Sequence, residues 1–186
     1  MATASRKTPA AARKAPAKTT RASSSGTDAI ALLRADHKRV SDLYEQYDKT
    51  RSTAKKKALV AQICQELTVH AQVEEEIFYP AVKAALKDKE LVPEAQVEHA
   101  TLKELIAQVQ DKEPDGEMFD AKIKVMSEYT KHHVKEEQNE MFPKARATRL
   151  DLKELGARIA ARKEELMADP SQIGSAPAPV TPEAVV

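Results

Sequence analysis

The sequence contains two copies of one pattern that constrains both the fold and the chemistry of the chain. One copy is HAQVEEEIFYP at residues 70–80, and the other is HVKEEQNEMFP at residues 133–143. In each copy a glutamate follows the histidine by four residues, an aromatic residue by nine and a proline by ten. Both copies lie where apolar residues recur at three- and four-residue steps, which indicates α-helices. The pattern predicts two equivalent helices, each with an imidazole and a carboxylate on one face.

Each copy is preceded by another helical stretch that has its own histidine. His37 lies 33 residues before His70, and His99 lies 34 residues before His133. An acidic residue directly precedes both His37 and His99. The chain has five histidines, so four of them occupy equivalent positions in two duplicated helical hairpins.

The apolar periodicity predicts an all-α protein. The first long helix should start at Thr27 or Asp28, the second should run from about residue 53 to 88, the third should begin at Pro93, and the fourth should run from about 117 to 145. We expect Pro80 and Pro143 to kink or divide the second and fourth helices. Short connections make sequential helices antiparallel neighbours. The fold class is therefore an up-down-up-down four-helix bundle, with a short extra C-terminal helix at about 149–168 and disordered tails.

The two ends of the chain differ in composition from this helical part. Residues 1–27 contain six basic residues and no acidic one, and residues 169–186 hold four of the ten prolines. Such segments bury too little apolar surface to fold alone. We therefore divide the chain into a disordered basic tail (1–27), the bundle (28–146), an appended helix (147–168) and a second disordered tail (169–186). The basic tail is interpreted as a solubilising extension, with weak nucleic-acid contact and a transit-peptide-like role as alternatives.

Composition and missing motifs exclude several function classes. A formal net charge of +1 argues against a nucleic-acid binder that uses the whole chain. The single cysteine, Cys64, argues against a disulfide framework and favours a cytoplasmic location. No apolar run approaches the roughly 18 residues of a membrane span, so we expect no membrane partner. The sequence has no Gly-rich phosphate loop, nucleophile elbow or cysteine pair for zinc.

The spacing of the histidines predicts a buried metal layer. At roughly 1.5 Å per residue, the histidines of each hairpin lie at similar depth from the hairpin turn. Six ligands in one layer suit two metal ions, each with two imidazoles, and two carboxylates that can bridge the ions. Imidazole with carboxylate suits iron, and also manganese or zinc. The predicted metal ligands are His37, His70, Glu74, His99, His133 and Glu137.

This arrangement resembles the haemerythrin-like, or HHE cation-binding, domain over about residues 28–146. The resemblance rests on the two His-x3-Glu segments with their prolines, each preceded by its own histidine. It implies a four-helix bundle around a non-haem diiron centre with two oxo- or hydroxo-bridged iron ions. It also implies that Glu74 and Glu137 bridge the ions and that the four histidines are terminal ligands. The small ligand would be dioxygen, peroxide or nitric oxide, used in oxygen or redox sensing or in detoxification.

The sequence departs from the oxygen-carrying haemerythrins at two positions. Those proteins have a further histidine one turn along the third helix, where this chain has Lys103, and a shorter aspartate at the position of Glu137. A missing imidazole opens a coordination position, which favours ligand activation or sensing over reversible oxygen carriage. Whether the chain is a peroxide- or nitric-oxide-consuming enzyme stays open. Ferritin-like diiron proteins use Glu-x-x-His, so the reversed order here disfavours that class.

A second function class also stays open. In it, the chain is an iron-responsive regulatory or interaction protein, a monomer or a dimer, whose basic tail binds a partner or nucleic acid. Among the residues near the predicted ligands, His132 could pair with Glu136 but breaks the repeat spacing. Tyr44 and Tyr129 are interpreted as core residues, with lining of the metal pocket or a proton-donor role as the alternative. Five acidic residues are expected to be solvated or ion-paired, with one or two holding a ligand imidazole: Asp36, Glu75, Glu76, Glu98 and Glu136.

Overall fold

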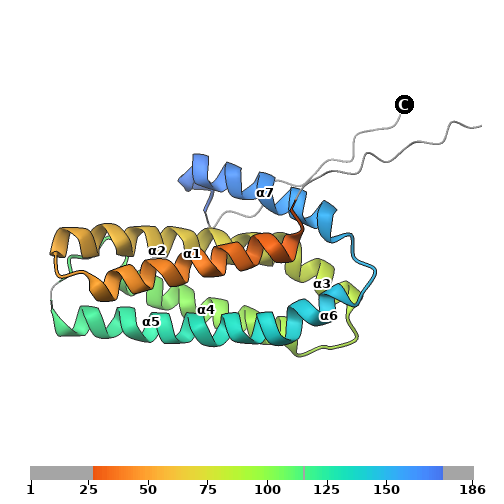
Figure 1. The fold of residues 1–186 in the computed structure, drawn as a ribbon, viewed down its shortest axis with the longest axis horizontal. Helices are drawn as coiled ribbons and strands as arrows, with labels where there is room; N and C mark the ends of the chain where they lie inside the picture. The colour runs from red at the N-terminus through yellow and green to blue at the C-terminus, as the bar shows by residue number, and fades with distance from the viewer. Residues whose placement is uncertain (1–26, 115, 174–186) are drawn as a thin grey trace, which may run out of the picture.

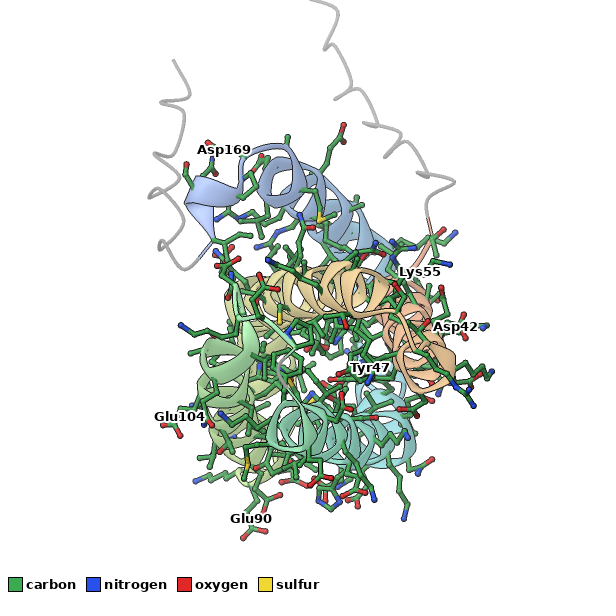
Figure 2. All side chains as sticks on the ribbon, turned by 90° about the vertical axis from the view of Figure 1, so that its left-hand side faces the viewer. Asp42, Tyr47, Lys55, Glu90, Glu104 and Asp169 are labelled. Atoms are coloured by element: carbon green, nitrogen blue, oxygen red, sulfur yellow. The ribbon has the colours of Figure 1, made fainter. Side chains whose placement is uncertain are left out.

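The computed structural model describes residues 27–114 and 116–173, and these residues form a bundle of helices (Figure 1). Its four long helices run alternately up and down, and the end-on view in Figure 2 shows them around a common core. They are α1 (Ala29–Lys49), α2 (Thr53–Val73), α4 (Leu91–Val109) and α5 (Glu117–Glu136). A further helix, α7 (Leu152–Ala168), lies against the outside of α1 and α2. The predicted fold class, a four-helix bundle with an extra C-terminal helix, is confirmed.

The helix starts follow from local capping chemistry. The side chain of Asp28 accepts a hydrogen bond from the Ala31 N–H at 2.8 Å, and Ser52 accepts one from the Lys55 N–H at 3.4 Å. Helix α5 starts after Gly116, whose φ of 119° is a conformation that residues with a Cβ rarely adopt. The third long helix begins two residues before Pro93, which therefore lies in its first turn, where no N–H donor is needed.

The prolines of the two repeat copies are accommodated by π-helical turns. The elements concerned are the π-helices Glu74–Phe78 and Glu137–Met141, followed by α3 (Tyr79–Ala85) and α6 (Phe142–Arg146). In each copy an N–H donates to a carbonyl five residues back, from Tyr79 to Glu74 and from Phe142 to Glu137. A proline one residue further on cannot donate an α-helical hydrogen bond. The expected kinks are therefore wide turns that begin at the two glutamates of the pattern, and π turns often mark functional sites.

The apolar core is divided into two clusters with a polar layer between them. On α1, Leu33 belongs to one cluster and Val40 to the other. Along the fourth helix, Met141 and Met126 are divided in the same way. The predicted ligands His37 and His133 lie between these positions, so each cluster seals one side of the layer that contains them.

Helix α7 is part of the first cluster. Its buried residues Leu155, Ile159 and Leu166 pack there. Gly156 allows its backbone to approach the start of α1, because a Cβ at this position would lie 2.3 Å from the carbonyl oxygen of Thr27. These contacts therefore hold α7 firmly against the first helix.

The predicted disordered tails lie almost wholly outside the described residues, which omit 1–26 and 174–186. Where the second tail is described, it differs from the prediction, because a short 3-10 helix, Pro170–Gln172, continues the chain beyond α7. Asp169 caps this turn by accepting from the Ser171 N–H at 3.1 Å, and Gln172 accepts from Arg162 at 3.1 Å. Within the described part of the chain, no helix combines the length and apolar character that crossing a membrane requires.

Candidate metal centre

The structure brings the six predicted ligands together in the layer between the two apolar clusters. Their side chains come from every long helix of the bundle and from the two π turns. All six residues are buried, with exposed fractions from 0% for Glu74 to 6% for His37. The proximity that the duplicated spacing predicted is therefore present in the structure.

The imidazoles form two pairs that point their Nε2 atoms at each other. The Nε2 atoms of His37 and His70 lie 3.0 Å apart, and those of His99 and His133 lie 3.2 Å apart. Two nitrogen ligands that each lie roughly 2.1 Å from one ion, at right angles, are about 3 Å apart. Each pair is therefore spaced as two ligands of a common metal ion would be.

The two carboxylates lie between the imidazole pairs. Glu74 Oε2 lies 3.2 Å from His70 Nε2 and 3.4 Å from His99 Nε2. Glu137 Oε2 approaches the two remaining imidazoles, His37 at 3.2 Å and His133 at 3.6 Å. Each carboxylate thus contacts one imidazole of each pair, which is the position that a bridging ligand between two ions occupies.

Two carboxylate oxygens in this layer lack hydrogen bonds. Glu74 Oε1 and Glu137 Oε2 are buried and accept no hydrogen bond of good geometry from the described residues, although Glu137 Oε2 lies 3.2 Å from His37 Nε2. A buried charged oxygen without a partner costs a folded protein several kcal/mol unless a cation balances it. The donor set, imidazole with carboxylate, is one that iron, manganese and zinc accept. The residues present therefore fit a metal site.

The pKa values in the layer are shifted because several ionisable side chains lie close together there. Burial alone would lower the pKa of His70, but the Glu74 carboxylate and hydrogen bonds to Glu74 and Asp36 raise it to about 10. Burial is likewise outweighed at His99, where hydrogen bonds to Glu74 and Glu75 raise the pKa to about 9. The pKa of Glu74 lies well below its ordinary value despite burial, because the His70 charge stabilises the carboxylate. Glu74 is thus held ionised, and in the metal-free layer the positive charge beside it comes from the imidazoles of His70 and His99.

Every imidazole that points its Nε2 inward has a polar partner on its outer nitrogen. The Nδ1 contacts are His70 with Asp36 at 3.4 Å, His99 with Glu75 at 3.0 Å, His133 with Glu98 at 2.7 Å and His37 with Gln138 at 3.1 Å. The three carboxylates accept from Nδ1, which fixes the tautomer that leaves Nε2 free for a metal and makes the imidazole a better ligand. The contact of His37 differs, because Gln138 presents its amide Nε2, a donor. Sequence reasoning allowed this role to one or two acidic residues, and the structure gives it to three.

The comparison with protein families matches residues 28–145 to the Hemerythrin HHE cation binding domain. The chain belongs to this family. A solved structure of a haemerythrin HHE cation-binding domain-containing protein from Mycobacterium kansasii shares the fold, with a TM-score of 0.67 over 80% of this chain and 93% of that one, at 21% identity. A curated relative from Nostoc sp., named "DNA nickase", is 26% identical over 111 residues, which are 60% of this chain and 31% of the relative. The chain therefore spans about a third of the length of that relative.

Within this haemerythrin-like site, sequence reasoning missed Tyr79. Its hydroxyl lies 3.0 Å from Glu137 Oε1, 3.2 Å from His99 Nε2 and 3.4 Å from Glu74 Oε2. Burial raises the pKa of Tyr79 above its ordinary value, and both carboxylates raise it further. The hydroxyl therefore stays protonated and donates to a carboxylate. The signal was present in the repeat, since Tyr79 is the aromatic residue of the first copy.

The corresponding aromatic of the second copy is Phe142, so the two halves of the site differ by one hydroxyl. The ring of Phe142 stacks on His37 with centroids 5.8 Å apart, and Tyr79 lies against His99 with centroids 5.3 Å apart. The aromatic position of the pattern therefore packs on an imidazole in both halves, but only one half presents a proton donor there.

The remaining candidate residues lie outside the layer. His132 has a side chain 61% exposed and contacts Glu136 on the outer face, with 3.1 Å between Nε2 and Oε1. Lys103, which replaces the further histidine of the oxygen carriers, forms an ion pair with Glu75 at 2.7 Å. Cys64 is buried in the second cluster, as expected for a small apolar residue. Glu76 pairs with Arg162 of α7 at 2.8 Å.

Proposed function

We propose that this haemerythrin-like bundle holds two iron ions, one between His37 and His70 and the other between His99 and His133. The observation that carries the proposal is the convergence of four inward Nε2 atoms and two carboxylates in one buried layer. Glu74 and Glu137 would bridge the two positions. Support also comes from the unsatisfied carboxylate oxygens and from the polar partner on each outer nitrogen.

The proposed role is the binding and conversion or sensing of a small molecule such as dioxygen, peroxide or nitric oxide. Iron in this layer would supply a Lewis acid and a one-electron redox couple. A void of about 10 Å³ adjoins all four imidazoles, which is the volume that one water-sized molecule needs. The protein would therefore admit only a ligand of a few atoms to this side of the layer.

The side chains around the layer suggest how such a ligand would be handled. The Tyr79 hydroxyl, 3.0 Å from Glu137, is a buried proton donor beside the His99–His133 position. The apolar clusters on both sides exclude bulk water and leave few competing proton sources. Lys103 faces Glu75 in place of a further imidazole, which leaves that position short of one nitrogen ligand. These features favour activation or sensing over reversible carriage.

The deciding experiment is metal analysis of the purified protein together with its visible absorption spectrum. We expect two iron ions per chain and absorption typical of a bridged ferric pair. Replacing both carboxylates, Glu74→Ala with Glu137→Ala, should abolish iron binding, whereas the matched change His132→Ala on the outer face should retain it. A wild-type chain that binds no transition metal, or equal loss in the His132 variant, would refute the proposal.

The type of reaction is tested separately on the iron-loaded protein. Steady-state consumption of hydrogen peroxide or nitric oxide would favour an enzyme, whereas a stable change in absorption without turnover would favour a sensor. Rapid autoxidation with no detectable oxygen adduct would argue against reversible oxygen carriage.

A second candidate function is metal-responsive binding to nucleic acid or a protein partner. It is favoured by the six basic residues of the segment 1–27 and by the name of the Nostoc relative, although this chain spans only a third of that protein. Metal binding would stabilise the bundle that presents the basic segment. DNA association that depends on iron and is lost on deleting residues 1–27 would support this function, and DNA binding unchanged by either treatment would contradict it.

A further inference from the structure

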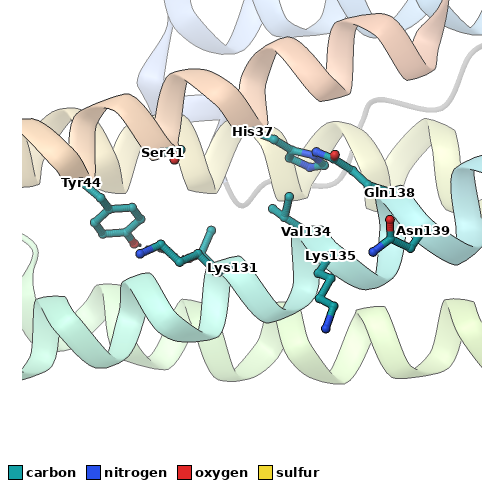
Figure 3. Close-up of a pocket in the computed structure, with 9 residues that line it drawn as sticks. His37, Ser41, Tyr44, Lys131, Val134, Lys135, Gln138 and Asn139 are labelled. Atoms are coloured by element: carbon teal, nitrogen blue, oxygen red, sulfur yellow. Dashed lines mark hydrogen bonds between the residues drawn. The ribbon is translucent and has the colours of Figure 1, made fainter.

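A second pocket lies between α1 and α5, next to the metal layer but separate from it (Figure 3). Its volume is about 300 Å³, and His37 forms one end of it. The void inside the layer shares His37, Thr130 and Val134 with this pocket. The lining includes His37, Ser41, Tyr44, Lys131, Val134 and Lys135.

The size of the pocket points to an organic occupant. A water molecule takes up about 30 Å³ in the liquid, so 300 Å³ is room for roughly ten waters. Dioxygen, peroxide and nitric oxide are far smaller than this. Ligand pockets for small organic molecules begin at about 300 Å³. The pocket is therefore too large to be explained by the ligand proposed for the metal layer.

The charges in the lining point to an anion. Lys131 and Lys135 both contribute to the lining, and neither forms an ion pair with any described residue of 27–114 or 116–173. No residue of the lining is acidic. Figure 3 shows Lys131 extending toward the hydroxyl end of Tyr44, whereas Lys135 points away from that hydroxyl. Two ammonium groups without a carboxylate partner among the described residues favour an oxyanion, because charge-assisted hydrogen bonds are the strong ones.

The rest of the lining suits a molecule with one polar and one apolar end. Tyr44 is buried, and its hydroxyl lies 3.4 Å from Thr130 Oγ1. Ser41 adds a further hydroxyl, and Val134 and the Tyr44 ring add apolar surface to the lining. Gln138 lies at the far end, 3.1 Å from His37 Nδ1. A bound molecule would thus rest against the outer side of one predicted ligand.

We propose that the α1–α5 pocket binds a small organic carboxylate, with the carboxylate group beside Lys131. Its apolar part would lie along Val134. The proposal rests on the pocket lining and not on the identity of the metal, so it can fail while the metal site stands, and the reverse is also true.

The test is titration of the full-length, zinc-loaded protein with benzoate, followed by NMR chemical-shift changes at constant ionic strength. Zinc is used because it is diamagnetic, and elemental analysis establishes its content independently. We expect saturable shifts at the residues of the pocket, and no saturation with neutral benzamide. Lys131→Gln should weaken benzoate binding about fivefold to tenfold, since it removes a charged hydrogen-bond donor. Lys124→Gln, on an exposed position of the same helix outside the lining, should leave the affinity unchanged.

A carboxylate can also bind a metal ion directly, and the variants separate this case. If benzoate shifts only residues of the metal layer and Lys131→Gln has no effect, benzoate binds the metal and the pocket proposal is overturned. Absence of saturable shifts up to the solubility of benzoate would overturn it as well. Ser41→Phe gives an independent check, because a ring placed in the pocket should block benzoate while the measured zinc content stays the same.

Discussion

The charge of Glu98 should contribute measurably to metal affinity although the residue is not a predicted ligand. Its Oε2 atom lies 2.7 Å from His133 Nδ1, the shortest of the four outer contacts to the imidazoles. A carboxylate that accepts from Nδ1 stabilises the imidazole when its Nε2 binds a cation. Glu98→Gln keeps the shape and an acceptor oxygen but removes the charge. This substitution therefore isolates the electrostatic part of the contact.

The expected size follows from the kind of hydrogen bond that is lost. A bond to a charged group contributes roughly twice as much as a neutral one, about 1.5–3 against 0.5–1.5 kcal/mol. The difference, about 1–1.5 kcal/mol, corresponds to a metal affinity that is weaker by roughly fivefold to twelvefold. Asp36→Asn should have a smaller effect, since Asp36 Oδ2 lies 3.4 Å from His70 Nδ1, beyond the usual range of a strong hydrogen bond.

The assay is competition for iron(II) or cobalt(II) against a chromophoric chelator, with helicity measured by circular dichroism. Glu94→Gln is the matched control, because Glu94 lies one turn before Glu98 on α4 and is exposed. An affinity of Glu98→Gln within twofold of the control would refute the reasoning. So would a larger loss in Asp36→Asn, because the distances would then not set the order.

Three further predictions follow from other parts of the structure. Tyr79→Phe should retain the metal but lower any peroxide consumption per metal by about a hundredfold, as loss of a positioned proton donor does; an unchanged rate would exclude this role. Gly156→Ala should lower the melting temperature by about 5 °C, because a Cβ would lie 2.3 Å from the Thr27 carbonyl oxygen, whereas Ala157→Ser should not change it. The raised pKa values of His70 and His99, about 10 and about 9, mean that their protons stabilise the metal-free fold fully below the unfolded pKa of about 6.5. That stability should be lost as the pH rises through 9 to 10, and thermal melts in which the metal-free protein is equally stable at pH 7 and pH 10.5 would contradict the assignment.

The sequence predicted the bundle and the meeting of the six candidate ligands because both depend on helical geometry. A helix fixes which residues share a face, and short connections fix the depth of each histidine along the bundle. The sequence did not predict the π turns, although Pro80 and Pro143 indicated where the helices would be disturbed. A proline excludes a regular α-helical hydrogen bond, but the choice among a kink, a break and a π turn depends on what the following turn packs against.

The outer contacts to the imidazoles were underestimated because one or two acidic residues were expected in this role, without regard to the repeat register. Asp36 and Glu98 each directly precede a histidine of one helix and contact the histidine of the next helix. Glu75 and Gln138 each directly follow a predicted bridging glutamate, and each contacts a histidine of the opposite hairpin. These four residues are also equivalent in the duplicated register. The repeat therefore marked these positions, but their role became clear only from the contacts between neighbouring helices.

The duplicated sequence builds two positions that are not electrostatically equivalent. Around His99 and His133, the outer nitrogens contact two carboxylates, Glu75 and Glu98, and the Tyr79 hydroxyl lies on the inner side. Around the other pair, the corresponding groups are a neutral amide, a single aspartate and a phenyl ring. That aspartate pairs with Lys163 of α7, as Glu75 pairs with Lys103, so the two halves differ by one carboxylate, Glu98. The first position is therefore the more electron-rich and the better supplied with a proton. The second faces the cationic α1–α5 pocket, so the two halves of one repeat present different chemistry on their two sides.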